Sequence, residues 1–230
     1  MRDSSDTASV SRRRMFGITA AAGLLAPASA GAGRHGEESW HRLVAGNRRF
    51  VDGGQTHPHE SLRWRESLVR GQRPFACVVG CADSRVPPEL VFDEGFGALF
   101  TIRAAGQVLD SSVLGSVEYA VEHLGVPLVV VLGHAGCGAV SAAIDVVHGR
   151  AAVSGDISCL VRAIEPAVLS TPPDRDDREF LARCVDSQAR RTAALVVERS
   201  VTTRTAVRHH GLLVVAASYR LDTGEVTRLG

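Results

Sequence analysis

The side chains best suited to chemistry stand in two short segments of the sequence. Cys81 and Asp83 are separated by one residue in the first segment, and His134 and Cys137 by two residues in the second. Two thiols, an imidazole and a carboxylate make a complete tetrahedral ligand set for zinc, and thiolate and imidazole donors favour zinc over magnesium or calcium. The two segments therefore predict one Zn²⁺ ion per chain.

The same residue types allow other interpretations. Cys81 and Cys137 could form a disulfide, or one of them could be a catalytic thiol. The zinc site could also be structural, with every ligand position filled by the protein. Arg85 follows Asp83 by two residues. It can form a bidentate pair with that carboxylate or take part in an ordinary surface ion pair.

Four short apolar runs alternate with helical patterns. The runs cover residues 75–80, 98–103, 128–132 and 212–217, and a more polar strand follows the turn at Asp222-Thr223-Gly224. Helices are predicted at 37–52, 60–70, 138–147, 156–169 and 177–200, with a further helix that begins at Asp110 or Ser111. This alternation predicts a single α/β domain, with a mainly parallel sheet of four core strands plus a C-terminal edge strand, flanked by helices.

These elements place the chemical side chains at one edge of the sheet. Cys81 directly follows the first predicted strand, and His134 and Cys137 directly follow the third. In open parallel sheets the functional site lies beyond the carboxyl ends of the strands. Gly138 opens the next helix, so its backbone amide can donate to an anionic oxygen.

Residues 1–30 have the order of an export signal, so the predicted domain covers residues 31–230. A basic segment at 11–16 precedes a short apolar run at 17–26 and small residues at 28–30. Arg13-Arg14-Met15-Phe16 resembles the twin-arginine export motif. The apolar run is shorter than the roughly 20 residues that span a bilayer. We expect an exported protein (periplasmic, cell-envelope or secreted) with no stable membrane association after signal cleavage.

The composition excludes several classes of function. All 26 basic side chains are arginine, which excludes Schiff-base chemistry on lysine and a phosphate loop that relies on lysine. The net charge of +1 gives no reason to expect a nucleic acid as partner. With five cysteines, a pure disulfide framework would leave one over. Cys77 and Cys184 lie in apolar patterns and are expected in the core.

The two chemical segments together resemble the β-class carbonic anhydrases. The resemblance rests on Cys81-Ala82-Asp83-Ser84-Arg85 followed much later by His134-Ala135-Gly136-Cys137-Gly138. It extends to the segment Leu43 to Phe50, to Gln72-Arg73-Pro74, to Glu118-Tyr119-Ala120-Val121 and to the closing segment from Tyr219 to Val226. It covers about residues 38 to 229, and the two motifs are highly specific in combination.

This resemblance implies a zinc enzyme that interconverts carbon dioxide with bicarbonate and a proton, a carbonate dehydratase. Cys81, His134 and Cys137 would hold zinc, and a zinc-bound hydroxide would attack carbon dioxide. Asp83 would either occupy the fourth ligand position or leave it to water. Pairing with Arg85 would pull the Asp83 carboxylate off the metal, so that it accepts a hydrogen bond from the hydroxide.

The resemblance also implies substrate contacts and an assembly. The Gln72 side chain would reach the substrate across a subunit interface, the Gly138 amide would bind a bicarbonate oxygen, and Phe100 and Tyr119 would form apolar walls. On pattern alone, Phe100 is more simply a core strand residue, whereas Tyr119 lies off the main apolar stripe of its helix. The N-terminal helix would wrap a neighbouring subunit in a homodimer or tetramer.

Two other functions fit part of the pattern. A hydrolase of carbonyl sulfide or carbon disulfide could use the same scaffold, because both molecules are linear isosteres of carbon dioxide. A redox or structural zinc protein without catalysis would have no exchangeable water on its metal. The Asp83–Arg85 pair, Gln72 and the length of the resemblance favour the hydratase.

Overall fold

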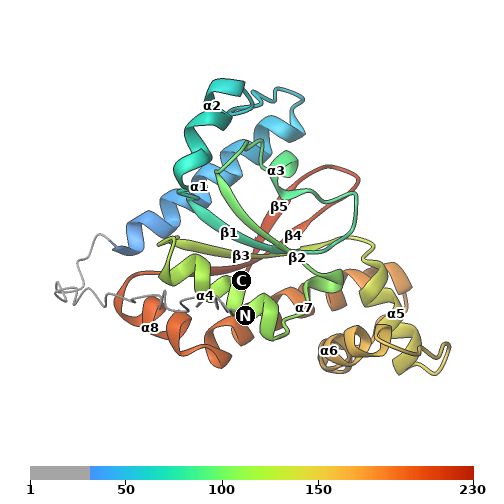
Figure 1. Ribbon diagram of the computed structural model, residues 1–230. Coiled ribbons are helices and arrows are strands. Elements are labelled where there is room, and N and C mark those ends of the chain that lie inside the picture. Colours follow the sequence, from blue (N-terminus) through green and yellow to red (C-terminus); the bar gives the residue numbers. More distant parts are fainter. Residues whose placement is uncertain (1–31) are drawn as a thin grey trace, which may run out of the picture.

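A five-stranded sheet forms the centre of the protein in the computed structural model, which describes residues 32–230 (Figure 1). The strand order is β2-β1-β3-β4-β5. Four strands are parallel, and β5 pairs antiparallel with β4 at the edge. The strands are β1 (Ala76–Gly80), β2 (Leu99–Arg103), β3 (Leu128–His134), β4 (Leu213–Tyr219) and β5 (Val226–Leu229). The predicted α/β architecture is confirmed, although β3 runs two residues further than expected and ends on His134.

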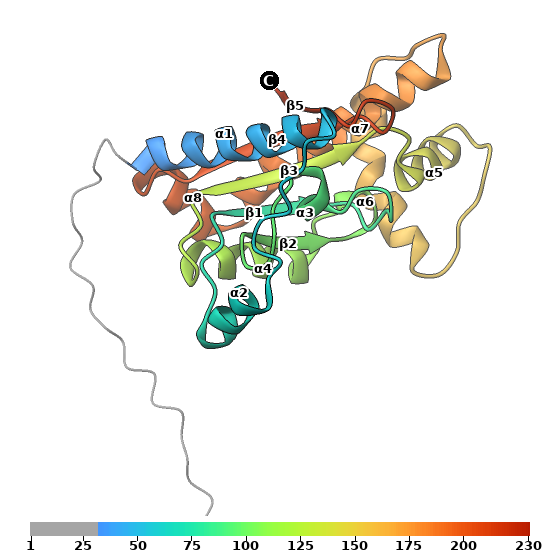
Figure 2. The ribbon, with the colours of Figure 1, turned by 90° about the horizontal axis from the view of Figure 1, so that it is seen from above.

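Helices cover both faces of this sheet, as Figures 1 and 2 show. One face carries α1 (Ala32–Val51) and α3 (Pro88–Val91), and the other carries α4 (Ser111–Glu122), α7 (Asp177–Arg199) and α8 (Val201–His209). Beyond the carboxyl ends of the strands lie α5 (Gly138–Val147) and α6 (Ile157–Ser170), which pack on α7. Shorter helical segments are α2 (Leu62–Ser67), η1 (Leu68–Arg70) and η2 (Ala105–Gln107).

Burial on both faces explains why the strands are apolar throughout. Every residue of β1 and β3 is buried. In β3, Val130 and Leu132 face α1, whereas Val129 and Val131 face the helices of the opposite layer. A strand covered on both faces cannot alternate apolar with polar residues, because neither set of side chains reaches water.

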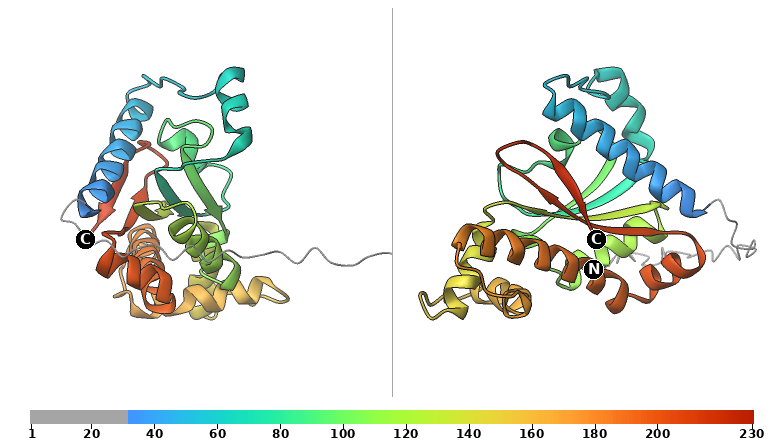
Figure 3. Two further views of the ribbon diagram at one scale, coloured as in Figure 1. Left: turned by 60° about the vertical axis from the view of Figure 1, so that its left-hand side comes forward. Right: turned by 180° about the vertical axis from the view of Figure 1, so that it is seen from behind.

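The apolar stripe of the N-terminal helix packs on this chain's own sheet, and the expected contact of that helix with a partner subunit stays a prediction. Trp40 and Leu43 are buried in the same cluster as Val130 and Val215, so the apolar stripe of α1 covers this chain's own sheet. Figure 3 shows α1 running across the back of the sheet. A Cβ at Gly46 would lie 1.8 Å from the Phe92 carbonyl oxygen, a measure of how closely this helix approaches its own chain. Without α1, the four-residue α3 would be the one helix left on this face of the sheet in the described part of the chain.

Two short helices were not expected from the sequence. Pro88 lies in the first turn of α3, where its fixed φ and missing N–H are tolerated. Ser200 ends α7 and caps α8, because its Oγ accepts a hydrogen bond from the Thr203 amide at 3.1 Å. His209 is the last residue of α8. Among residues 32–230, no helix is both long enough and apolar enough to cross a membrane.

The predicted export signal (residues 1–30) and the predicted start of the domain at residue 31 lie outside the residues that the structure describes.

Candidate metal centre

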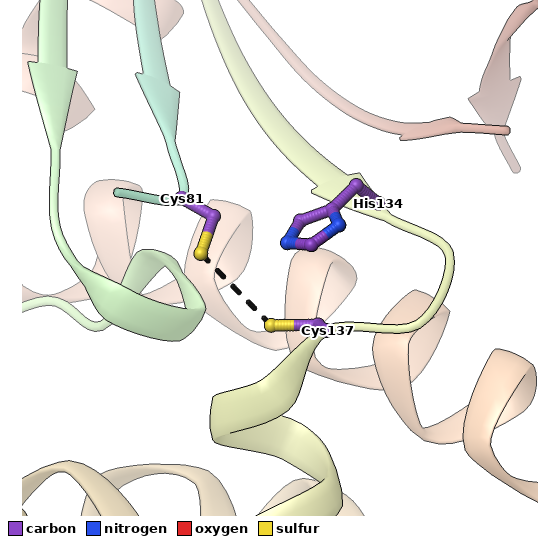
Figure 4. Close-up of side chains that lie close together, drawn as sticks. All are labelled: Cys81, His134 and Cys137. Carbon is purple, nitrogen blue, oxygen red and sulfur yellow. Dashed lines mark hydrogen bonds between the residues drawn. The ribbon is translucent and has the colours of Figure 1, made fainter. Parts of the chain in front are cut away.

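The pairing of β1 with β3 brings the two chemical segments together. Gly80 pairs with Leu132, so Cys81 leaves β1 beside the point where β3 ends at His134. Cys137 then occupies the N-cap position of α5. The ligand atoms of Cys81, His134 and Cys137 all lie within 4.8 Å of one another, and the three residues are buried (Figure 4).

The His134 ring is oriented toward the two sulfurs by its own loop. Its Nδ1 lies 3.0 Å from the Ala135 carbonyl oxygen, which fixes Nδ1 as the protonated nitrogen. Its Nε2 is buried without a hydrogen-bond partner among the described residues. An unpartnered buried nitrogen costs free energy unless something binds it. A cation between Nε2 and the two thiolates meets that need, so the cluster fits zinc.

The two thiols influence each other strongly. Their Sγ atoms lie 4.0 Å apart. The pKa of Cys81 is lowered to about 4, chiefly by the hydrogen bond from Cys137 and despite the effect of burial. The pKa of Cys137 is raised by its contact with Cys81 and by burial. The pair therefore gives up one proton easily and the second only when a cation takes its place.

A disulfide does not explain this pair. All five cysteines lie in the described part of the chain, and all are free. A separation of 4.0 Å is about twice the length of an S–S bond, roughly 2.05 Å. Cys81 and Cys137 instead belong to an apolar cluster with side chains of α5, α6 and α7, such as Val140 and Ile164. Cys77 and Cys184 are buried as expected, and Cys159 is exposed on α6.

Asp83 lies beside the cluster, but Arg85 holds it. The Arg85 Nε and Nη2 donate to the two carboxylate oxygens at 2.9 and 2.7 Å, and the Arg85 amide donates at 2.9 Å. These contacts, led by the guanidinium, hold the pKa of Asp83 well below its usual range. One Asp83 oxygen lies 3.9 Å from His134 Nε2, so the carboxylate faces the metal position without joining the ligand group.

Two arginines tie the loops of the site together. Arg85 also donates to the Gly136 carbonyl at 3.3 Å, which links the segment after β1 to the segment after β3. Arg103, the last residue of β2, donates to the carbonyls of Cys81 and Asp83 at 2.9 and 2.5 Å. Arg103 was not predicted as a site residue. The one feature of the sequence that could have indicated it is its place at the end of a predicted strand.

Gly138 begins a helix, as the sequence predicts. It is the first residue of α5, directly after Cys137, and its amide belongs to the helix-end donors that have no partner within the helix. A Cβ at this position would meet nothing within 4 Å, so the space in front of Gly138 is open. A small anionic substrate could approach the amide there.

The remaining predicted site residues lie toward the other end of the sheet. Gln72 precedes β1 and Cys81 follows it, so the whole strand, which has five residues and a length of about 16 Å, lies between them. Gln72 instead lines an open cavity of about 640 Å³ between α1 and the amino end of β1. Phe100 pairs with Cys77 in the first half of the strands, and the Tyr119 ring lies 6.0 Å from that of Phe100. One chain therefore does not bring these three residues to its own metal centre.

Comparisons with known proteins agree with this geometry. A family described as carbonic anhydrase matches residues 76–226. Carbonic anhydrase 2 of Mycobacterium tuberculosis is 43% identical over 188 residues, which cover 81% of this chain and 89% of that protein. The carbonic anhydrase of Mycolicibacterium smegmatis is 40% identical over 191 residues, which cover 82% and 90%.

Solved structures show the same fold. A tetrameric β-carbonic anhydrase of Sordaria macrospora superposes with a TM-score of 0.68 at 22% identity, and covers 84% of this chain and 98% of its own. The β-carbonic anhydrase of Coccomyxa superposes with a TM-score of 0.64 at 21% identity, over 81% and 84% of the two chains. Taken with the matched family and the Cys-His-Cys group, these findings show that the chain belongs to the β-class carbonic anhydrase family, whose members are lyases.

Proposed function

We propose that this protein catalyses the reversible hydration of carbon dioxide to bicarbonate and a proton. The observation that carries the proposal is the Asp83–Arg85 pair beside a group of only three ligands. A structural zinc site is closed by four protein ligands, whereas a catalytic site keeps one position open. Because Arg85 engages both carboxylate oxygens, Asp83 does not close the fourth position.

The chain supplies the surroundings that this reaction needs. When bound, zinc would act as a Lewis acid that makes water a nucleophile near neutral pH. The Asp83 carboxylate is held ionised by Arg85, so it can accept a hydrogen bond from the attacking water and orient it. The Gly138 amide can donate to the oxygen on which charge develops. Apolar side chains behind the ligands, including Val140 and Ile144, exclude other water.

A stopped-flow assay of carbon dioxide hydration on the zinc-loaded protein tests the proposal, with carbonyl sulfide and carbon disulfide in parallel. The comparisons do not support the hydrolase alternative, and we expect hydration to dominate. Cys81→Ser, His134→Ala and Cys137→Ser should each lower zinc content, and Cys184→Ser, which removes a buried thiol outside the group, should not. A zinc-loaded protein with no hydration activity would overturn the proposal. If it also failed to hydrolyse carbonyl sulfide and carbon disulfide, a structural role for zinc would be the remaining interpretation.

We further propose that the active unit is a homodimer or a tetramer, in which Gln72, Phe100 and Tyr119 of one chain serve the metal centre of another. Their distance from their own centre supports this arrangement. Exposed apolar side chains on the same part of the chain support it too: Leu62, Val69, Leu90 and Phe96. Exposed apolar side chains mark an interaction surface where they form a contiguous patch.

We also propose export by the twin-arginine route, on the basis of residues 1–30 alone. That route carries folded proteins, so zinc could bind the thiolates in a reducing compartment before export. Replacing Arg13 and Arg14 with lysine should leave the protein inside the cell with its signal uncleaved. Fractionation of the producing cells measures this, and unchanged export of the double variant would contradict it.

A further inference from the structure

A chain of buried hydrogen bonds connects the middle of α7 to the Cys81 sulfur. The Gly106 amide donates to Cys81 Sγ at 3.3 Å. The Gly106 carbonyl accepts a hydrogen bond from Gln188 Nε2 at 3.3 Å. The same Nε2 lies 3.3 Å from Thr192 Oγ1, one turn further along α7. All these groups are buried, and Gln188 and Thr192 are 2% and 1% exposed.

Gly106 is a residue whose conformation needs to be held. Its φ of 63° and ψ of 23° lie in the left-handed region. Glycine adopts that region freely, but it also adopts many others. A Cβ at this position would lie 2.6 Å from Ile164 Cδ1, so a larger residue would have to displace that side chain and would also be strained at this φ. Within η2 the Gln107 amide donates to the Ala104 carbonyl at 2.9 Å, and a contact from outside the turn can further hold the conformation that directs the Gly106 amide at sulfur.

Gln188 is placed to make that selection. Its carboxamide holds the carbonyl of Gly106 on one side, while the amide of Gly106 meets Cys81 on the other. Both dihedral angles of Gly106 are then set by groups at its two ends. Thr192 Oγ1 accepts a second hydrogen bond from the same Nε2 and so keeps the Gln188 carboxamide from rotating.

We propose that Gln188 is a positioning residue for the metal ligand Cys81, acting through Gly106, with Thr192 as its orienting partner. An amide hydrogen bond to a thiolate withdraws electron density from the sulfur and fixes the direction of its lone pairs. Groups that hold a metal ligand in this way commonly set both the affinity and the electronic properties of the site. This inference rests on the metal centre of the proposed function.

Cobalt substitution gives a readout that a merely structural role would not change. The thiolate-to-cobalt charge-transfer band reports the electron density on the ligand sulfurs. Gln188→Met keeps the length of the side chain but cannot donate, so the Gly106 amide should drift from Cys81 and the band should move to longer wavelength. Zinc affinity, measured by competition with a chromophoric chelator, should fall about tenfold.

Two further variants make the experiment decisive. Thr192→Val keeps the shape of the side chain but removes the hydroxyl, and should shift the band in the same direction by less. If Gln188→Met does not fold, Thr192→Val decides the question by itself. Val196→Ala is the matched control, because Val196 is fully buried on the same helix but lies outside the hydrogen-bond chain.

The outcomes separate this inference from the proposed function. If the unaltered protein shows no thiolate-to-cobalt band, the metal centre itself is wrong and the positioning proposal falls with it. If that band is present, but Gln188→Met and Thr192→Val both match Val196→Ala in band position and zinc affinity, the proposal for Gln188 is overturned and the metal centre stands.

Discussion

At the scale of single residues, the site depends on side chains that each hold two partners. Arg85 donates hydrogen bonds to both carboxylate oxygens of Asp83 and to the Gly136 carbonyl. Arg103 donates to two carbonyls of the segment that carries Cys81. An arginine suits this role because its planar guanidinium presents several donors in fixed directions. In the proposed function, the Arg85–Asp83 pair would decide whether the carboxylate faces a water or the metal itself.

Arg85→Ala should lower carbon dioxide hydration about 10- to 100-fold without loss of zinc. Without its partner, the Asp83 carboxylate is free to move the short distance to the metal and close the open position. Stopped-flow hydration and zinc content measured on the same samples check this. Arg150→Ala is the control, since it breaks an exposed pair with Asp145 at the end of α5 opposite to Cys137. Wild-type activity in Arg85→Ala would remove this pair from the mechanism.

At the scale of elements, α1 is fastened to the segment after α3 by two ion pairs as well as by its apolar stripe. Arg42 donates to both oxygens of Glu94 at 2.7 and 2.6 Å. Arg49 donates to Asp93, whose oxygens also accept from the amides of Thr56 and His57. The carboxylates of Asp93 and Glu94 are 1% and 3% exposed, whereas Arg42 and Arg49 are 47% and 35% exposed, so each pair joins a buried carboxylate to a partly exposed arginine.

Asp93→Asn should cost about 2 kcal/mol of unfolding free energy at pH 7, and the cost should fade in acid. Burial raises the pKa of Asp93, but Arg49 and the amides outweigh it and lower that pKa from 3.8 to about 2. Because the folded pKa is lowered, the stabilisation is complete above pH 4 and is lost as the pH falls toward 2. Urea unfolding of both proteins across this range measures the difference.

The matched control for that experiment is Asp145→Asn, which breaks an ion pair whose partners are 40% and 48% exposed. Its cost should stay below about 1 kcal/mol, because solvent screens an exposed pair. If Asp93→Asn were as mild as Asp145→Asn at pH 7, the anchoring role of the Arg49–Asp93 pair would be wrong.

Removal of α1 should abolish the soluble fold. A chain that begins at residue 31 keeps this helix and should behave as a soluble protein, whereas one that begins at residue 54 exposes Leu128, Val130 and Val215. Size-exclusion chromatography and near-ultraviolet circular dichroism compare the two chains. A soluble, well-folded product from the shorter chain would show that the sheet does not need α1 as its cover.

At the scale of the whole molecule, the proposed assembly would make the two ends of the sheet complementary halves of one site. The carboxyl ends of β1 and β3 hold the metal ligands, and the amino ends lie near Gln72, Phe100 and Tyr119. A strand is too long for one chain to join these halves. A second copy with the opposite placement can do so, and symmetric pairing would complete both sites at once.

Mixed dimers test this arrangement. Gln72→Ala and His134→Ala should each be poorly active as pure proteins, for different reasons. In a mixed dimer, the chain with Gln72→Ala supplies an intact ligand group and its partner supplies an intact Gln72. Random pairing should restore about a quarter of the activity of the unaltered protein. No recovery in dimers purified with two different tags would show that each chain uses its own Gln72.

The local chemistry and the fold class could be predicted from the sequence, because both depend on patterns that short segments carry. The apolar runs specify strands, and their alternation with helices specifies a parallel sheet. Residues that follow parallel strands must meet at one edge, so the grouping of Cys81, His134 and Cys137 followed from their positions.

Only the tertiary structure shows which surface the apolar stripe of α1 covers and which hydrogen-bond donors contact the side chains of the site. The stripe of α1 shows that the helix has an apolar face, but periodicity does not say whether that face covers its own sheet or another chain. The pairing of Asp83 with Arg85 at 2.7 Å, and its distance of 3.9 Å from His134 Nε2, are likewise set by the fold. Gln188 lies more than a hundred residues from Cys81 in the chain, and hydrogen bonds link it to that thiol through Gly106 only because the fold packs α7 against η2.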